Sequence, residues 1–375
     1  METVYCLDRM KQQVWVDDLC VSAATVGKVV AAELTRLNVY QQQVLDFLQE
    51  WFSGADTLRV QTSGSTGAPK PMEVEKARMM ASAVATCDFL QLNASCRALL
   101  CLPMQYIAGK MMVVRALVAG FRLLTVPPCG HPLAGLDEAP DFAAMVPLQV
   151  CHSLQVPAEA ERLRSTGVLM IGGGAIDAAL EQTLRGFPHQ VWSTYGMTET
   201  LSHIALRRLD GDAASTWYIP MKGVEVSLRE GALCIDAPAV HAGVLCTNDL
   251  AEMNDRGEFR ILGRRDNVIN SGGIKIQMEE VEDALRPCLS VPFQVTAVPH
   301  PVLGEEMVVL VEGVCSPACI AEIERCCRTG LPAYWCPKRV IFVDRLPLTE
   351  TGKPQRKRAR ELALNTEGLP QCRIE

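Results

Sequence analysis

Residues 61–74 read QTSGSTGAPKPMEV. The two glycines of this stretch allow backbone N–H groups to turn inward around an anion, the hydroxyl side chains add further donors, and the lysine adds positive charge. The residues concerned are Ser63, Gly64, Ser65, Thr66, Gly67 and Lys70. The spacing differs from the P-loop of nucleoside triphosphatases, which has four residues between its glycines and then Gly-Lys-Ser/Thr. A polyphosphate is the predicted ligand, although such a loop taken alone is also typical of a tight turn without a ligand.

The composition indicates a globular protein with small-molecule partners. The chain has 375 residues, of which 49% are hydrophobic and 21% charged, and this length is enough for two or three domains. The formal net charge of −7 is spread along the sequence, which argues against a general nucleic-acid-binding surface.

The cysteines and the apolar segments favour a cytoplasmic protein. The sixteen cysteines contain no CxxC pair and sit mostly inside apolar runs, so we expect reduced, mostly buried thiols. The first twenty residues have no apolar stretch of signal-peptide length. The longest apolar region, residues 111–129, is interrupted by Arg115, Arg122 and two prolines, so we expect it in the core and not in a membrane.

The apolar periodicity predicts an α/β fold for the first part of the chain. Residues 77–90 are expected to form a helix, and residues 168–171 a strand that runs into three glycines and then a helix. A further strand leads to STYGMTE, residues 193–199, and residues 222–236 alternate like antiparallel strands of a β-rich subdomain. The residues expected on the packed face of the first helix are Ala77, Met80, Ala81, Val84, Ala85 and Phe89.

A second domain is predicted to begin near Asp266. Residues 263–285 pass from a charged turn through Ser-Gly-Gly to a helix, and the sequence beyond alternates strands and helices in a compact α+β unit. We therefore expect an N-terminal domain over residues 1–265 and a C-terminal domain over residues 266–375.

Six motifs in a fixed order point to one family. They are TSGSTGAPK (62–70), GGG (172–174), YGMTE (195–199), TNDL (247–250), GRRDNVINSGG (263–273) and LTETGK (348–353). Through them the chain resembles the adenylate-forming enzymes, which include acyl- and aryl-CoA synthetases, firefly luciferase and peptide-synthetase adenylation domains. The resemblance implies a large α/β domain with a β-rich subdomain and a small mobile α+β lid. It also implies an acid–thiol ligase that uses ATP, Mg²⁺ and CoA.

The resemblance assigns a role to each matching residue. Those expected to hold the β- and γ-phosphates of ATP are Thr62, Ser63, Gly64, Ser65, Thr66, Gly67 and Lys70. Those expected around the adenine are Gly172, Gly173, Gly174, Tyr195, Gly196 and Met197. Thr198 is expected to touch the α-phosphate, Glu199 to hold Mg²⁺, and Asp249 with Arg264 to bind the ribose hydroxyls. Lys353 is expected where negative charge concentrates as the acyl-adenylate forms.

The two half-reactions of such a ligase need different surroundings. The family rotates its C-terminal domain about the residue that corresponds to Asp266, which is therefore the expected hinge. The rotation is expected to bring the tunnel for the CoA thiol to the site. The tunnel residues implied by the resemblance are Asn270, Ser271, Gly272 and Gly273.

Within the family, residues 105–117 and 195–206 are most similar to the short bacterial o-succinylbenzoate–CoA ligases of menaquinone biosynthesis. One carboxylate of this diacid must lie at the α-phosphate of ATP to react, so the other must be bound elsewhere in the pocket. Tyr106, Ser202 and His203 are the leading candidates for the acid pocket, with Lys110 and Arg115 ranked below them. The expected partners are the acid, ATP and CoA, without nucleic acid or membrane, and a homodimer stays open.

Several departures and alternatives accompany this interpretation. The chain has about sixty residues before its phosphate loop where the family usually has well over a hundred, so we expect a trimmed N-terminal part, and TNDL replaces the commoner Thr-Gly-Asp. Taken singly, Glu199 fits a helix N-terminus, Asp249 a turn cap, and Lys353 a solvated basic face. The alternative functions are another acyl- or aryl-CoA ligase, an adenylation protein that loads a carrier, and a nucleotide-binding regulator without catalysis.

Overall fold

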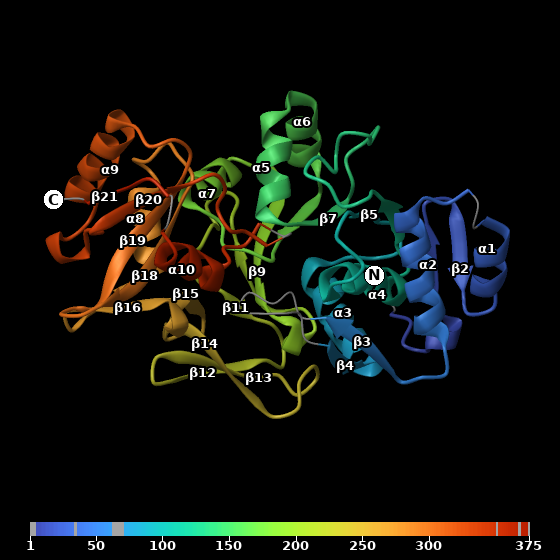
Figure 1. Ribbon diagram of the computed structural model, residues 1–375. Helices are drawn as coiled ribbons and strands as arrows, with labels where there is room; N and C mark the ends of the chain where they lie inside the picture. The colour runs from blue at the N-terminus through green and yellow to red at the C-terminus, as the bar shows by residue number, and fades with distance from the viewer. Residues whose placement is uncertain (1–4, 34–35, 62–70, 350–351, 367–368, 374–375) are drawn as a thin grey trace.

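The computed structural model describes residues 5–33, 36–61, 71–349, 352–366 and 369–373 (Figure 1). In these ranges the largest sheet has nine strands. The sheet is parallel from β9 to β1, and β11, β10 and β2 are antiparallel to their neighbours. In spatial order its strands are β11 (Ile219–Pro220), β10 (His203–Arg208), β9 (Gln190–Gly196), β8 (Val168–Ile171), β7 (Phe142–Met145), β5 (Arg97–Leu100), β6 (Arg122–Thr125), β1 (Gln13–Val16) and β2 (Leu19–Ser22).

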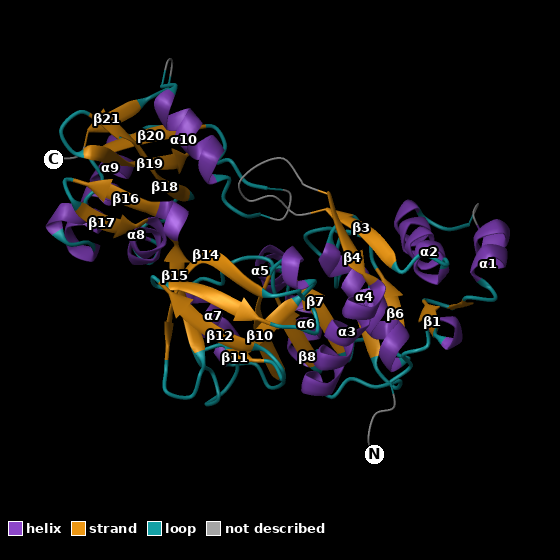
Figure 2. Ribbon diagram, turned by 90° about the horizontal axis from the view of Figure 1, so that it is seen from below, coloured by secondary structure: helices purple, strands orange, loops and turns teal. Residues whose placement is uncertain are grey.

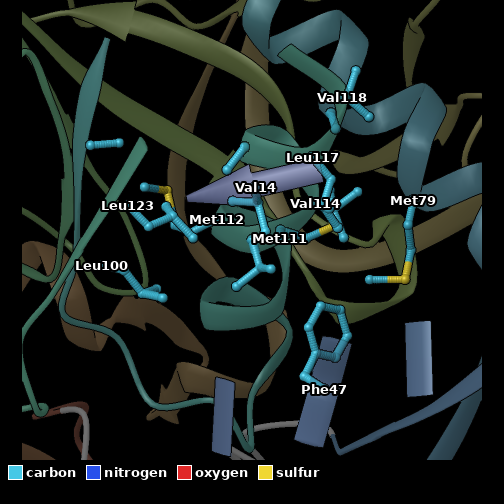
Figure 3. Close-up of a cluster of buried hydrophobic side chains, with 14 of the residues drawn as sticks. Val14, Phe47, Met79, Leu100, Met111, Met112, Val114, Leu117, Val118 and Leu123 are labelled. Atoms are coloured by element: carbon cyan, nitrogen blue, oxygen red, sulfur yellow. The ribbon is translucent and has the colours of Figure 1, made fainter. Parts of the chain in front are cut away.

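The two faces of the large sheet enter separate cores, because successive side chains of a strand point to opposite faces. Ala98 and Leu100 of β5 pack in the core that holds α2 (Val39–Phe52), α3 (Lys76–Leu90) and α4 (Ile107–Ala119). Leu99 packs on the other face, with α5 (Pro147–Gln155), α6 (Pro157–Ser165) and α7 (Ala178–Arg185). Figure 3 shows side chains of the first core, including Phe47, Met79 and Leu117. The sheet is thus covered on both faces, as the α/β prediction requires.

The helix predicted over residues 77–90 is present, and most of its predicted face packs against the core, but the most deeply buried residues are others. Met79, Ala83 and Cys87 are buried, whereas Ala77 is exposed and Val84 only half-buried. The same holds for the rest of the predicted face, whose members are half-buried: Met80, Ala81, Ala85 and Phe89. The helix is covered on more than one side, so the apolar pattern alone did not single out its most buried stripe.

Lys76 joins the start of α3 to the end of α2. Its side chain is buried, and its Nζ donates hydrogen bonds to the carbonyl oxygens of Glu50 (2.7 Å) and Trp51 (2.9 Å). These carbonyls belong to the last turn of α2, where Ser53 also donates to the Glu50 carbonyl and Arg9 to the Trp51 carbonyl. The lysine therefore adds a charged donor to this capped helix end.

Smaller elements complete the N-terminal part. A two-stranded ladder of β3 (Thr57–Gln61) and β4 (Pro71–Glu75) flanks residues 62–70, the expected phosphate loop, which lies outside the described residues. The short 3₁₀ helix η1 (Arg9–Lys11) and the helix α1 (Val26–Glu33) lie near the N-terminus. In the described part of the chain no helix is both long and apolar enough to cross a bilayer.

The predicted β-rich subdomain is a four-stranded antiparallel sheet, with the order β12 (Glu225–Arg229), β13 (Ala232–Asp236), β14 (Val244–Met253) and β15 (Phe259–Arg264). Cys234 and Cys246 face each other across β13 and β14 and are joined in a disulfide. The expectation that all thiols are reduced is therefore wrong for this pair, because strand pairing brings together cysteines twelve residues apart. The expectation of mostly buried thiols is also wrong, since most free cysteines in the described ranges are half-buried.

Beyond residue 267 the chain forms a separate C-terminal domain, which lies apart from the large sheet in Figure 2. One side of its sheet packs against α8 and α9, and the other against α10. The 3₁₀ helix η3 (Arg265–Asn267) connects it to β15 and contains the expected hinge, Asp266. Its elements are β16 (Val268–Ser271), β17 (Ile274–Gln277), α8 (Met278–Leu285), β18 (Phe293–His300), β19 (Gly304–Glu312), α9 (Pro317–Gly330), the 3₁₀ helix η4 (Ala333–Trp335), β20 (Arg339–Val343), α10 (Arg356–Leu364) and β21 (Gln371–Arg373).

Candidate active site

Two cavities lie where the C-terminal domain meets the ends of β8 and β9. The larger, of about 880 Å³, lies between the domains and is lined by Gly174, Arg264 and Asp266 among others. The smaller, of about 190 Å³, lies under the end of the large sheet and is lined by Gly172 and Thr198 among others. Lys353 lines both cavities. The structure thus brings several predicted site residues to one place.

The glycines at the ends of β8 and β9 keep backbone and side chains in close approach. A Cβ atom on Gly172 would lie 2.4 Å from Thr194 Oγ1, and one on Gly196 would lie 2.3 Å from the carbonyl oxygen of Ser202. Gly173 has a φ of +81°, which favours glycine. Gly172 and Gly196 therefore allow close packing within the protein at the ends of β8 and β9. Four of the residues expected around the adenine, Gly172, Gly173, Gly196 and Met197, line the smaller cavity, whereas Gly174 lines the larger one.

Tyr195, Asp249 and Arg264 form one hydrogen-bonded group beside the larger cavity. Tyr195 Oη donates to Asp249 Oδ2 at 2.6 Å, and Arg264 Nη1 lies 3.0 Å from Asp249 Oδ1. Burial raises the pKa of Tyr195 above its ordinary value, and Asp249 raises it further, so the phenol keeps its proton. Each Asp249 oxygen retains a second lone pair. Asp249 can therefore still accept hydrogen bonds from a diol.

Lys353 stands on the wall common to the two cavities. Its backbone N–H donates to Thr349 Oγ1, and its carbonyl accepts from the Thr349 N–H, so the turn that carries it is fixed. Burial lowers the pKa of Lys353, and the positive charge of Arg264 lowers it further. No acidic side chain in the described ranges pairs with this ammonium group. It is therefore available to an anionic ligand.

Thr198 and Glu199 lie on the 3₁₀ helix η2 (Thr198–Thr200), directly after β9. Thr198 lines the smaller cavity, and Glu199 is exposed beside it, with no ion pair to any described residue. A free carboxylate at this position fits Mg²⁺, which prefers one or two carboxylates plus phosphate oxygens. In the described ranges no three His, Cys, Asp or Glu side chains gather as a metal site of their own. The predicted phosphate ligands Thr62, Ser63, Gly64, Ser65, Thr66, Gly67 and Lys70 lie outside those ranges.

A buried cation, Arg115, also lines the smaller cavity, although Ser202 and His203 were the favoured candidates for the acid pocket. Arg115, in the middle of α4, is only 2% exposed, and its Nη2 donates to Ser202 Oγ at 2.5 Å. Its Nε has no hydrogen-bond partner, and no acidic side chain in the described part of the chain pairs with it. Burial lowers the pKa of Arg115 to about 10, which leaves it charged at neutral pH. The only signal in the sequence is a charge within the apolar run MMVVRALVA, residues 111–119.

Ser202 and His203 extend the group around Arg115. Ser202 Oγ lies 3.2 Å from His203 Nδ1, and His203 Nε2 lies 3.1 Å from Thr86 Oγ1. Burial, together with the charge of Arg115, holds the pKa of His203 well below its ordinary value, so this imidazole is neutral. Within this group of Arg115, Ser202 and His203, the arginine is therefore the one cation.

The remaining candidates divide into two groups. Tyr106 lines the smaller cavity at the start of α4. Lys110 does not reach the cavity, because its Nζ donates to the Arg59 carbonyl at 3.2 Å and lies 5.6 Å from the centroid of the Phe47 ring. Residues 270–273, the expected CoA tunnel, lie at the β16–β17 turn, where Gly272 N–H donates to the Leu303 carbonyl, and they line neither cavity.

Comparison with known proteins gives two consistent results. Residues 23–249 match the family model described as AMP-binding enzyme, and residues 280–353 match the AMP-binding enzyme C-terminal domain. A 2-succinylbenzoate–CoA ligase from Bacillus mycoides (strain KBAB4) is 29% identical over 357 residues, which cover 84% of this chain and 72% of that relative.

Solved structures show the same relationship. The crystal structure of an acyl-CoA synthetase (AMP-forming)/AMP-acid ligase II-like protein from Dyadobacter fermentans DSM 18053 has 35% identity and a TM-score of 0.59, over 88% of this chain and 95% of that one. The o-succinylbenzoate CoA synthetase from Bacillus subtilis, in complex with the acyl-adenylate intermediate OSB-AMP, has 23% identity and a TM-score of 0.67. The match covers 80% of this chain and 68% of that one, and it supports the fold.

Proposed function

Because the chain belongs to the AMP-binding enzyme family, whose model matches residues 23–249, we propose that it is an AMP-forming acid–CoA ligase whose acid is o-succinylbenzoate. In the first half-reaction a carboxylate oxygen attacks the α-phosphorus of ATP, and pyrophosphate leaves. In the second, the CoA thiol attacks the acyl carbon, AMP leaves, and the thiol proton passes to solvent. The product would serve menaquinone biosynthesis.

The observation that carries the choice of acid is the unpaired, buried guanidinium of Arg115. A buried charge is costly unless an opposite charge and hydrogen bonds compensate it. Among the described residues its Nε has no hydrogen-bond partner, and Lys353 lines the same cavity. An acid with two carboxylates satisfies both cations at once: the ring carboxylate would pair with Arg115, and the aliphatic one would lie beside Lys353. A fatty acid would leave the guanidinium unpaired.

The other residues fit the adenylation step. Lys353 would offset the negative charge that builds up as the carboxylate meets the α-phosphate, in a site largely closed to water. The glycines at the ends of β8 and β9 would receive the adenine, and Asp249 with Arg264 the ribose. Glu199 would hold Mg²⁺, which neutralises phosphate charge when bound.

The relatives support the same assignment. The Bacillus mycoides protein is named a 2-succinylbenzoate–CoA ligase, and the Bacillus subtilis structure holds the adenylate of that acid. Both resemblances extend over at least four fifths of the present chain.

The test is a panel of acids scored for pyrophosphate release with ATP and Mg²⁺, followed by addition of CoA. We expect release with o-succinylbenzoate and thioester formation with free CoA. The matched control is 4-oxo-4-phenylbutanoate, which lacks the ring carboxylate and should react far more slowly. Equal or better activity with medium-chain fatty acids would refute the assigned acid, and an acyl-AMP that CoA does not discharge would favour a carrier-loading enzyme.

A further inference from the structure

The expected hinge, Asp266, is held by two side chains of the N-terminal part. Asn248 Nδ2 lies 3.1 Å from Asp266 Oδ2 and 3.3 Å from Oδ1, and Arg264 Nη2 lies 3.2 Å from Oδ2. Arg264 also pairs with Asp249 through Nη1. The hinge carboxylate is thus connected to the group that we assign to the ribose.

Asn248 reaches the hinge because β14 bulges at this point. Cys246 pairs with Cys234 and Leu250 with Ala232, so residues 247–249 face a single residue of β13, Leu233. Thr247 fixes the bulge, since its Oγ1 donates to the Leu233 carbonyl and accepts from Asp249 N–H. In a regular strand, neighbouring side chains point to opposite faces. Here Asp249 contacts Arg264, the last residue of β15, and its neighbour Asn248 contacts Asp266, which follows β15 in η3.

We propose that Asn248 is a positioning residue that holds the hinge in the orientation in which Lys353 lines both cavities, and so sets the balance between adenylation and thioester formation. This inference rests on the proposed two-step reaction. A glycine at this position, as in the commoner Thr-Gly-Asp motif, has no side-chain donor for the hinge.

The hydrogen bond between Asn248 and Asp266 is weak enough to break each time the C-terminal domain rotates. Asn248 is exposed and the Asp266 side chain is 47% exposed, so water competes for both groups and the net gain from the hydrogen bond is small. A small difference is enough, because the populations of two orientations follow their free-energy difference exponentially. We therefore expect loss of the amide to shift the ratio of the two half-reaction rates about threefold to tenfold.

The experiment compares Asn248→Ala and Asn248→Asp with the matched control Glu252→Gln, which removes an exposed ion pair to Arg260 from the same strand. Formation of acyl-AMP and its transfer to CoA are measured separately in single turnovers, the second from preformed acyl-AMP. Asn248→Ala should slow adenylation relative to transfer, and Asn248→Asp should do so more strongly, because its carboxylate repels Asp266. In Glu252→Gln the ratio of the two half-reaction rates should equal that of the wild type. The melting temperature should stay the same in all three variants.

A second measurement, the rate of cleavage by trypsin, reports on the hinge and does not depend on the proposed reaction. Arg265 is exposed, so trypsin cleavage after it should accelerate by a similar factor in the Asn248 variants but not in Glu252→Gln. An unchanged ratio of half-reactions, an equal loss of both, or the same shift in the control would overturn the inference. If the wild-type chain makes no acyl-AMP but the cleavage rates follow this order, the proposed function fails and the role of Asn248 at the hinge stands.

Discussion

Replacing Arg115 by methionine tests the diacid assignment most directly. The change keeps a long side chain in α4 but removes the charge that has no acidic partner in the described part of the chain. On the proposed reaction, the wild-type guanidinium pairs with the ring carboxylate of o-succinylbenzoate inside the protein. The variant would leave that carboxylate buried and unpaired.

The expected size follows from burial. Arg115 is 2% exposed, and removing one partner of a buried, hydrogen-bonded charge pair costs about 3–5 kcal/mol. Each 1.36 kcal/mol is a factor of ten in rate, so kcat/KM for the diacid should fall by about 10²- to 10³-fold or more. The monoacid 4-oxo-4-phenylbutanoate never pairs with the guanidinium, so its kcat/KM should stay constant or rise.

Without ligand, the stability of Arg115→Met should not fall as its activity does. Replacing a buried cation that has no acidic partner in the described ranges by an apolar side chain of similar length removes its desolvation cost, which offsets the lost hydrogen bond to Ser202. We therefore expect the melting temperature of Arg115→Met to be unchanged or a few degrees higher.

The assay is pyrophosphate release with each acid, with melting followed calorimetrically. Lys110→Met is the matched control, because this lysine lies on the same helix but donates to the Arg59 carbonyl outside the cavity. Its selectivity between the two acids should equal that of the wild type. Arg115→Met activity that falls equally with the diacid and the monoacid, or a clear drop in its melting temperature, would refute the reasoning.

Four further predictions concern three side chains. Lys353→Ala should slow adenylation by about 10²- to 10³-fold but spare transfer from preformed acyl-AMP, and equal loss of both would contradict its role. Because burial and Arg264 lower the pKa of Lys353, kcat/KM for ATP should fall as pH rises through a midpoint below the ordinary lysine value, and Lys353→Arg should move that fall to higher pH. Glu199→Gln should raise the Mg²⁺ concentration needed for adenylation about tenfold to a hundredfold, with rates recovering at saturating metal; a loss that metal does not relieve argues against metal binding. Lys76→Met should lower the free energy of unfolding by about 1–3 kcal/mol in a denaturant titration, because the carbonyls of Glu50 and Trp51 each lose one charged donor, whereas exposed Lys28→Met should change it little.

Local patterns in the sequence predicted much of the fold. The strand at residues 168–171, the glycines after it and the strand that leads to Tyr195 are all present, because backbone freedom and apolar runs act over short distances. The family motifs also predicted that Gly172, Thr198 and Lys353 lie together, and they line one cavity. The most deeply buried positions of α3, such as Met79 and Ala83, were not predicted because that helix is covered on several sides.

Contacts between distant segments could not be read in the same way. The disulfide of Cys234 and Cys246 depends on the register of β13 and β14, and no spacing rule signals it. Arg115 was ranked below Ser202 and His203 because proximity to Glu199 in the sequence favoured the latter. Its true distinction, a buried charge without an acidic partner in the described ranges, appears only when all the neighbours of α4 are known.

Lys353 reaches both cavities from a turn of the C-terminal domain. The other walls of the smaller cavity belong to the N-terminal part, so a rotation of the C-terminal domain about η3 would carry the ammonium group away from it. On the proposed reaction, one side chain therefore makes the charge around the substrate depend on the position of the domain.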